Sequence, residues 1–228
     1  MRKGDTRREQ ILLTAESLFY ARGYEQTSIQ DILDALRFSK GGFYHHFDSK
    51  LSLLKAICDM RAEESFEAAR EALMRYMGNP IAQLNAMMDS GGMLRAEKLD
   101  YVGLLLRVAY REDGALMREK LKQRTLELML PLMDQVVLEG VKAGLFTLPH
   151  PHLGGELLLR LCAQFTDEAA HVLGSGGEEE ERLSDILAKL ELYRHAVERL
   201  LSAPFGSVVL YDMGNLAAVY RGLSMRKR

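Results

Sequence analysis

The nonapeptide SKGGFYHHF, residues 39–47, places a lysine, a tyrosine, two histidines and two adjacent glycines close together. If a helix begins after the serine, each following side chain is rotated by about 100° around the helix axis. Phe43 and Phe47 then fall on one face, while Gly41 and His45 centre the opposite face. The segment is therefore amphipathic in an unusual way, with aromatic rings inward and small or polar groups outward.

The outward face carries groups that suit contact with nucleic acid. Two glycines in a short helix each cost about 1 kcal/mol relative to alanine, so a purely structural helix has no reason to expose them. Without side chains at Gly41 and Gly42, the helix backbone can approach another surface closely. Lys40 and Tyr44 can donate to phosphate oxygens, and a helix with this face fits the major groove, where base edges are distinguishable. The segment predicts a DNA-reading helix; a core helix with incidental surface glycines is the alternative.

A metal site is the weaker interpretation of the histidines. His45 and His46 are adjacent, so their side chains project about 100° apart and do not converge as an i, i+4 pair does. His150 and His152 flank a proline in an expected loop, and no third ligand of typical spacing accompanies them. We therefore expect no metal and no other cofactor.

Three short helices are expected to position this segment. Thr6 and Glu9 have the capping-box spacing that starts a first helix, and Gly23 suits the residue just after its end. Residues 27–30, TSIQ, form a second capping box, and a two-residue connection leads to Ser39, an N-cap residue for the third helix. Three short helices with a tight turn between the second and third describe a helix-turn-helix unit.

Helical periodicity continues through the rest of the chain, and convincing strand alternation is almost absent. A long fourth helix is expected to begin at Lys50, after a cap at Asp48 or Ser49, and to run to about Met77. Further helices are expected over residues 80–89, 96–110, 113–144 with a kink at Pro131, 153–173 and 178–202.

The predicted fold is all-α. An N-terminal three-helix helix-turn-helix domain, residues 1–56, is joined through the long fourth helix to a larger helical domain, residues 57–228. One strand-like run, VVLY at 208–211, is too isolated to form a sheet.

Composition fits a soluble globular protein, with 47% hydrophobic and 27% charged residues. No run of 18 uncharged apolar residues predicts a membrane span, and the charged first ten residues lack the apolar segment of a secretory signal. With two cysteines in the chain, we expect no disulfide framework. We therefore expect a cytoplasmic protein that does not enter a membrane.

Charge alone indicates little about partners. Residues 1–56 hold nine basic against seven acidic side chains, whereas the remainder holds 21 against 25. This asymmetry is too mild to argue for nucleic acid by itself.

Residues 6–56 resemble the DNA-binding region of the TetR family of bacterial transcriptional regulators. The first part of the pattern is GYEQTSIQDI, residues 23–32, and the second is SKGGFYHHF followed by a polar pair and Lys50. The match is long and ordered, and it covers about a quarter of the chain. Beyond it, the resemblance lies in the nine-helix layout and in the GVKAGLF stretch, residues 140–146.

The resemblance implies roles for individual residues at a DNA surface. Thr27 and Ser28 would cap the second helix and touch phosphate, and Lys50 would meet phosphate from the start of the fourth helix. Lys40 and Tyr44 would hold the DNA backbone. Gly42 and His45 would face bases, beside Gly41 on the same outward face.

Two positions depart from the family pattern. The turn between the second and third helices often has glycine where this chain has Arg37. If Arg37 adopts the left-handed conformation, strain of about 1 kcal/mol follows, and its side chain gains access to a phosphate. Gly42 stands where a threonine-like residue is common, which shifts more of the base readout to His45.

Apolar stripes on the last two expected helices indicate either packing within their own domain or pairing with a second copy. The resemblance implies a four-helix dimer interface, and a two-fold dimer suits a palindromic DNA site. We expect a homodimer whose interface contains Leu157, Leu158, Leu161, Phe165, Leu183, Ile186, Leu187, Leu190, Val197 and Leu201.

Nine of the twelve methionines lie between residues 60 and 133. Core filling explains them, and so does an adaptable apolar pocket, because methionine accommodates varied partners. In the resembled family these helices enclose an effector cavity. The candidate effector contacts are Met88, Tyr101, Arg107, Tyr110, Met129, Met133 and Phe165, and Asn85 and Gln164 are weaker candidates.

No catalytic constellation is present in the sequence, so we expect no enzyme. The leading hypothesis is a sequence-specific DNA-binding regulator, a repressor released from a palindromic duplex by a small apolar or amphipathic ligand. The alternative is an all-α ligand-binding or interaction module whose helix-turn-helix-like segment docks a protein.

Overall fold

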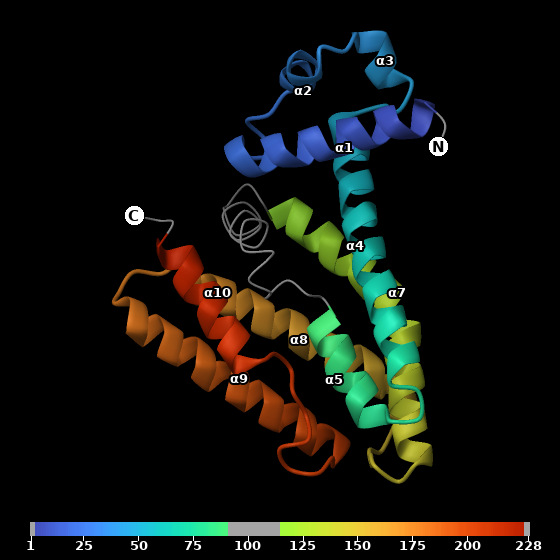
Figure 1. Cartoon of the computed structure of the whole chain (residues 1–228), viewed down its shortest axis with the longest axis vertical. Coiled ribbons are helices and arrows are strands. Elements are labelled where there is room, and N and C mark those ends of the chain that lie inside the picture. Colours follow the sequence, from blue (N-terminus) through green and yellow to red (C-terminus); the bar gives the residue numbers. More distant parts are fainter. Residues whose placement is uncertain (1–2, 91–114, 226–228) are drawn as a thin grey trace. The chain divides into compact units, whose positions relative to one another are not determined.

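A computed structural model describes residues 3–90 and 115–225, and every regular element in these two stretches is a helix. The all-α prediction is confirmed. In chain order the helices are α1 (Lys3–Arg22), α2 (Ile29–Leu36), α3 (Lys40–Tyr44), α4 (Lys50–Arg75), α5 (Pro80–Ser90), α7 (Ala115–Lys142), α8 (Pro151–Gly174), α9 (Glu179–Leu201) and α10 (Met213–Met225) (Figure 1). Part of the prediction lies outside the described residues: the helix expected over residues 96–110, the start of the helix expected over residues 113–144, and Tyr101, Arg107 and Tyr110.

The chain divides into two compact units, and the division falls within two long helices. One unit runs to Ala62 and includes α7 as far as Arg124, while the other takes α4 from Glu63 and α7 from Thr125. Both α4 and α7 are therefore continuous helices whose two ends belong to different units. No helix in the described stretches is long and apolar enough to span a bilayer.

The first unit is built on α1, which packs against α2. The largest fully buried side chains of this unit come from α1, α2, α3 and α4, and they are Ile11, Phe19, Ile32, Leu33, Phe43, Leu53, Leu54 and Ile57. A helix as short as α3 is marginal by itself, so burial of its one phenylalanine against this core holds it in place. The exposed side chains of α3 are therefore held on a helix that is packed against the core of the first unit.

The start of α1 differs from the prediction, whereas its end agrees. The helix begins at Lys3, so Thr6 lies inside it and does not cap its first turn. The capping-box spacing of Thr6 and Glu9 was misleading because helical backbone continues upstream of it. Gly23 follows the helix with φ of +98°, and its N–H donates to the carbonyl of Phe19 at 2.9 Å, as expected for a C′ glycine.

The second unit has one apolar core drawn from α4, α5, α7, α8, α9 and α10. Pro80 opens α5, and the side chain of Asn79 accepts from the Ala82 N–H at 3.1 Å as a cap. Helices α8 and α9 pack together, and α10 packs on α9 (Figure 1). Sequence periodicity did not predict α10; its Leu216 and Tyr220 are buried in this core.

Helices α7 and α8 approach unusually closely. A Cβ atom added to Gly155 on α8 would lie 2.2 Å from Oδ1 of Asp134 and 2.9 Å from the Asp134 backbone nitrogen on α7. No side chain fits there without movement of the α7 backbone. Glycine at this position is therefore a packing requirement of the second unit.

Candidate nucleic-acid interface

Helix α2 begins with a reciprocal capping box made by Ser28 and Asp31. The Ser28 hydroxyl accepts from the Asp31 N–H at 3.1 Å, and the Asp31 carboxylate accepts from the Ser28 N–H at 2.7 Å. The hydrogen bonds from the Ser28 side chain and backbone lower the pKa of Asp31. The predicted capping box over residues 27–30 is thus displaced by one residue. Ser28 remains exposed at the start of α2.

The prediction that Thr27 touches phosphate is wrong for its side chain. Thr27 is fully buried, and its hydroxyl donates to the carbonyl of Gly23 at 2.8 Å. A hydroxyl committed to the end of α1 cannot reach a surface ligand. Thr27 therefore fixes the α1–α2 connection.

Arg37 adopts the left-handed conformation that the turn requires, with φ of 54° and ψ of 42°. Its N–H and that of Phe38 donate to the carbonyls of Asp34 and Leu33 at the end of α2. A non-glycine residue in this region carries strain of about 1 kcal/mol. The side chain of Arg37 is exposed.

Helix α3 is capped by Ser39, whose hydroxyl accepts from the Gly42 N–H at 3.3 Å. The predicted N-cap is confirmed. Phe43 is fully buried and Phe47 is 4% exposed, with their ring centroids 5.9 Å apart, so both belong to the core as expected. His46 is half-buried beside them.

The opposite face of α3 is open to solvent. Lys40, Gly41, Tyr44 and His45 are exposed, and the Tyr44 ring is packed edge-on against Phe43 at a centroid distance of 5.4 Å. A Cβ atom added to Gly41 would meet nothing within 4 Å, and one added to Gly42 would meet only the Ser39 hydroxyl at 3.5 Å. Packing within the chain therefore does not require either glycine.

Lys50 does not offer its ammonium outward, so the structure does not support the predicted phosphate contact. Its Nζ donates to the carbonyl of Tyr24 at 3.0 Å and to that of Glu25 at 3.5 Å, and it lies 4.4 Å from the Tyr24 ring centroid. Burial, and after it the Glu25 charge, raises the pKa of Tyr24. Lys50 thus ties α4 to the α1–α2 loop, while the Ser49 hydroxyl caps α4 by accepting from the Ser52 N–H.

Sequence reasoning left out two arginines that contact the residues flanking α3. Arg7 and Arg8, both exposed on α1, place their guanidinium carbons 5.9 Å from the Phe38 ring centroid and 5.3 Å from that of Phe47. The sequence feature that could have drawn attention to them is an adjacent pair of arginines near the amino end of an expected helix. Nothing in the sequence alone relates that pair to α3.

The methionines that were candidate effector contacts lie in the core of the second unit. Met88, Met129 and Met133 are no more than 7% exposed, and Phe165 is 1% exposed. The Cys162 thiol points at the Met88 sulfur at 3.0 Å, and burial raises the pKa of Cys162 to about 12. These side chains act as core packing in the described structure.

The two weaker effector candidates have structural partners. The Asn85 side chain donates to the Ser207 carbonyl and accepts from the Val209 N–H, both at 2.9 Å. This residue therefore holds the segment before α10 against α5. Gln164 is exposed and donates to Glu168 at 3.2 Å.

The predicted dimer contacts on α8 and α9 differ in how exposed they are within one chain. Seven of them are buried within one chain and are unavailable to a second copy: Leu158, Phe165, Leu183, Ile186, Leu190, Val197 and Leu201. Leu161 and Leu187 are half-buried, and Leu157 is 44% exposed. Periodicity cannot distinguish a helix face that packs inside its own chain from one that meets a copy. Leu153 and Leu192, which were not predicted, are exposed as well.

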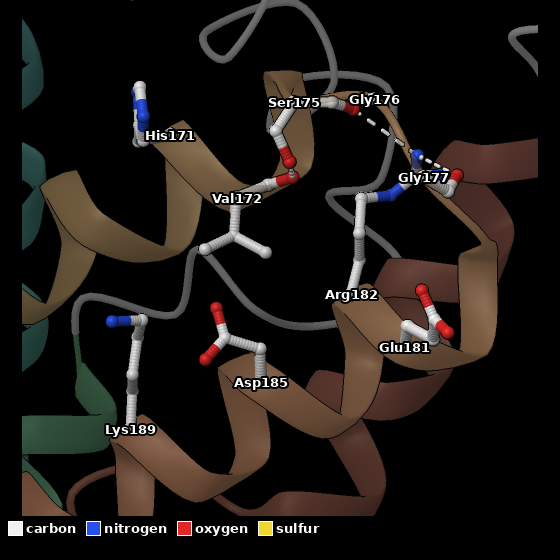
Figure 2. Close-up of a pocket in the computed structure, with 9 residues that line it drawn as sticks. All are labelled: His171, Val172, Ser175, Gly176, Gly177, Glu181, Arg182, Asp185 and Lys189. Carbon is white, nitrogen blue, oxygen red and sulfur yellow. Dashed lines mark hydrogen bonds between the residues drawn. The ribbon is translucent and has the colours of Figure 1, made fainter.

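A pocket of about 400 Å³ opens at the turn between α8 and α9, lined by charged side chains and the loop of residues 175–177. Figure 2 shows Arg182 hydrogen-bonded to the backbone of this loop, through the carbonyls of Ser175 and Gly177. Its Nε also donates to the Tyr220 hydroxyl at 3.0 Å. None of the candidate effector residues in the described stretches lines this pocket.

Part of the first unit is similar to known proteins. Residues 11–57 match the family model described as bacterial regulatory proteins, tetR family. An uncharacterized HTH-type transcriptional regulator of Lactococcus lactis subsp. lactis is 35% identical over 96 residues, which is 42% of this chain and 49% of the relative. The transcriptional repressor KstR2 of Rhodococcus jostii is 40% identical over 65 residues, 28% of this chain and 32% of the relative.

A third curated relative acts in the opposite sense from the repressor. The transcriptional activator FasR of Mycolicibacterium smegmatis is 36% identical over 75 residues, 33% of this chain and 34% of the relative. The chain thus spans about half or less of the length of these three relatives.

Solved structures show the same fold over most of the chain. A TetR-family regulator of Pectobacterium atrosepticum superposes with a TM-score of 0.59 at 23% identity, over 90% of this chain and 99% of that one. Reduced NemR of E. coli superposes with a TM-score of 0.59 at 20% identity, over 88% and 99%. At these identities the likeness concerns the fold.

Proposed function

Because the chain belongs to the TetR family of bacterial regulatory proteins, we propose that it is a sequence-specific DNA-binding regulator of transcription that reads duplex DNA with α3. The supporting observation is the exposed face of α3. Its two glycines serve no packing need, and Tyr44 and His45 project beside them from a helix anchored by buried Phe43. A helix with a bare backbone face and adjacent hydrogen-bonding side chains fits the major groove.

Base recognition falls mainly on His45 in this proposal. Gly42 offers no side chain, so imidazole and the Tyr44 hydroxyl are the groups on this face that can reach a base edge or phosphate. Lys40 supplies a point charge, and Ser28 at the start of α2 supplies an exposed hydroxyl. Arg37, exposed in the turn before α3, adds a further cation.

A selection from random duplex DNA tests this proposal. The wild-type chain should enrich a defined sequence, and its affinity for that sequence should fall steeply as salt rises. Tyr44→Ala/His45→Ala should abolish the preference while the thermal unfolding midpoint is unchanged. Tyr76→Ala/His152→Ala, which removes an exposed tyrosine and an exposed histidine from the second unit, is the matched control. Equal affinity of the α3 variant and the wild type would overturn the proposal.

We propose further that the protein acts as a homodimer on a palindromic site, in the cytoplasm, where its DNA target lies. Two-fold symmetry of the protein requires two-fold symmetry of the site it reads. The α8–α9 side chains available for such an interface include Leu153 and Leu157, one turn apart on α8, and Leu192 on α9. Sedimentation of Leu157→Glu should show monomer where the wild type shows dimer, and an unchanged dimer would exclude this surface.

Release from DNA by a small apolar or amphipathic ligand completes the proposal. The named relatives include both a repressor and an activator, so whether this protein represses or activates transcription is a question for experiment. A reporter gene behind the selected sequence distinguishes repression from activation. Screening compounds for loss of binding to that sequence, with release of the DNA as the readout, tests the ligand. None of the named relatives is described as an enzyme.

A further inference from the structure

Arg7 and Arg8 of α1 stand at the two ends of the segment that contains α3. Arg7 lies over Phe38, two residues before α3, and Arg8 lies over Phe47, three residues after it. Consecutive residues on a helix diverge by about 100°, which lets one pair of arginines reach both rings. Figure 1 shows the amino-terminal part of α1 on the α3 side of the first unit.

The two rings are themselves fixed by the core. Phe47 is 4% exposed and contacts Phe43, the buried anchor of α3, at a ring-centroid distance of 5.9 Å. Phe38 follows the left-handed Arg37, and its N–H is bound to the carbonyl of Leu33 at 3.0 Å. Each guanidinium is therefore held in register with α3 and not merely attached to α1.

The contacts of Arg7 and Arg8 with the aromatic rings leave the guanidinium N–H groups available for hydrogen bonds to a ligand. Such a contact uses the π electrons of the ring, and at an exposed site it contributes about 0.5–1 kcal/mol. Among the side chains that the structure describes, no carboxylate forms an ion pair with Arg7 or Arg8. By contrast, Arg22 at the other end of α1 is paired with Asp31 at 3.4 Å.

We propose that Arg7 and Arg8 bind DNA phosphates on either side of the groove that α3 enters. An exposed, oriented guanidinium presents a planar set of donors that suits phosphate oxygens. The pair would set the register of α3 on the duplex and contribute the same affinity to any sequence. This inference rests on the proposed DNA-binding function and adds two residues that neither the sequence pattern nor the comparisons assign.

The slope of log affinity against log salt measures these contacts. Each phosphate contact contributes about 0.9 to that slope on duplex DNA. Arg7→Gln/Arg8→Gln, which removes the charge but keeps a polar, hydrogen-bonding side chain, should lower the slope by about 2 for each bound protomer. The loss should be equal on the selected sequence and on an unrelated duplex of the same length. Arg7→Lys/Arg8→Lys, which keeps the charge, should retain the wild-type slope.

Arg70→Gln is the matched control, because Arg70 is exposed and ion-paired with Glu67 in the second unit. Its slope should equal that of the wild type. An unchanged slope in the glutamine variant would overturn the inference, and so would an affinity loss confined to the selected sequence. Equal losses in the lysine and glutamine variants would assign the arginines to ring packing alone. If the wild type itself binds no duplex, the proposed function fails first, so the two failures are distinguishable.

Discussion

The Arg61 guanidinium of α4 grips the Glu16 carboxylate of α1 with two hydrogen bonds, Nε to Oε1 at 2.8 Å and Nη2 to Oε2 at 2.5 Å. Glu16 is almost fully buried and the Arg61 side chain is 22% exposed. On the same turn of α4, Asp59 pairs with Arg124 of α7 at 3.2 Å. The last turns of α4 in the first unit are thus fastened to both α1 and α7.

Removing the arginine from this pair should destabilise the first unit. Arg61→Met leaves the Glu16 carboxylate buried without its bidentate partner, which costs about 3 kcal/mol. Urea unfolding followed by circular dichroism measures the loss. Glu16→Met/Arg61→Met should be more stable than Arg61→Met, because the buried carboxylate is removed together with its bidentate partner. Equal stability of wild type and Arg61→Met would contradict this account.

Gly41→Ala should separate folding from DNA binding. The added methyl group meets nothing within 4 Å, and alanine favours helix by up to about 1 kcal/mol relative to glycine. The variant should unfold at an equal or higher urea concentration, yet bind the selected duplex at least about tenfold more weakly because its backbone cannot approach as closely. Fluorescence anisotropy of labelled duplex provides the measurement. Retained affinity would show that the bare face of α3 is not the contact surface.

The first unit could be predicted in detail because its signals are local. The Ser39 cap, the left-handed Arg37 and the buried Phe43 each follow from a residue and its near neighbours. The capping box of α2 was misplaced by one residue because adjacent Thr27 and Ser28 both qualify as caps. Burial decides between them, and burial of Thr27 depends on its packing against the end of α1, where its hydroxyl contacts the carbonyls of Leu18 and Gly23.

Contacts between distant segments explain the remaining differences. Lys50 looks like a surface cation in sequence, but it bonds the Tyr24 carbonyl 26 residues away. Likewise, the apolar stripe that contains Leu190 and Val197 fits either a chain core or a dimer interface, and only the packed structure places these two side chains inside. Helix α10 was missed because glycine and aspartate interrupt the pattern just before its buried Leu216 and Tyr220.

Gly155→Ala should weaken the second unit. The new methyl group would lie 2.2 Å from Oδ1 of Asp134 and 2.9 Å from its backbone nitrogen, so α7 and α8 must separate. Overpacking of this kind costs about 1–3 kcal/mol. Differential scanning calorimetry should show a lower unfolding midpoint. Gly176→Ala, where the added methyl meets nothing within 4 Å, is the matched control and should leave the midpoint unchanged.

Asp134 should make stability fall as the pH rises. Its Oδ1 is buried without a hydrogen-bond partner among the described residues, and desolvation, followed by the Glu156 charge, raises the pKa of Asp134 above its ordinary value of 3.8. The folded state therefore holds this proton more tightly than the unfolded state does. The resulting loss of stability is absent below pH 3.8, the ordinary pKa of the group. It is complete once the pH exceeds the raised pKa of Asp134 in the folded state.

Asp134→Asn removes that titration and should flatten the pH profile. The free energy of unfolding of the variant should exceed that of the wild type at neutral pH, and the difference should shrink on acidification towards pH 3.8. Urea titrations at intervals from pH 3.5 to 7 measure both curves. Parallel curves for Asp134→Asn and wild type would contradict the assignment.

Arg37→Gly tests two properties of the turn before α3: the backbone strain at Arg37 and the contact of its guanidinium with DNA. Glycine adopts the left-handed conformation without the steric penalty of a side chain, so the unfolding free energy should rise by up to about 1 kcal/mol. If the exposed guanidinium meets a phosphate, the same change should lower the salt slope of DNA binding by about 0.9 per protomer. Arg37→Lys, which keeps the charge and the strain, should retain both wild-type values. A more stable Arg37→Gly with an unchanged salt slope would leave Arg37 a role in the turn and none at the DNA.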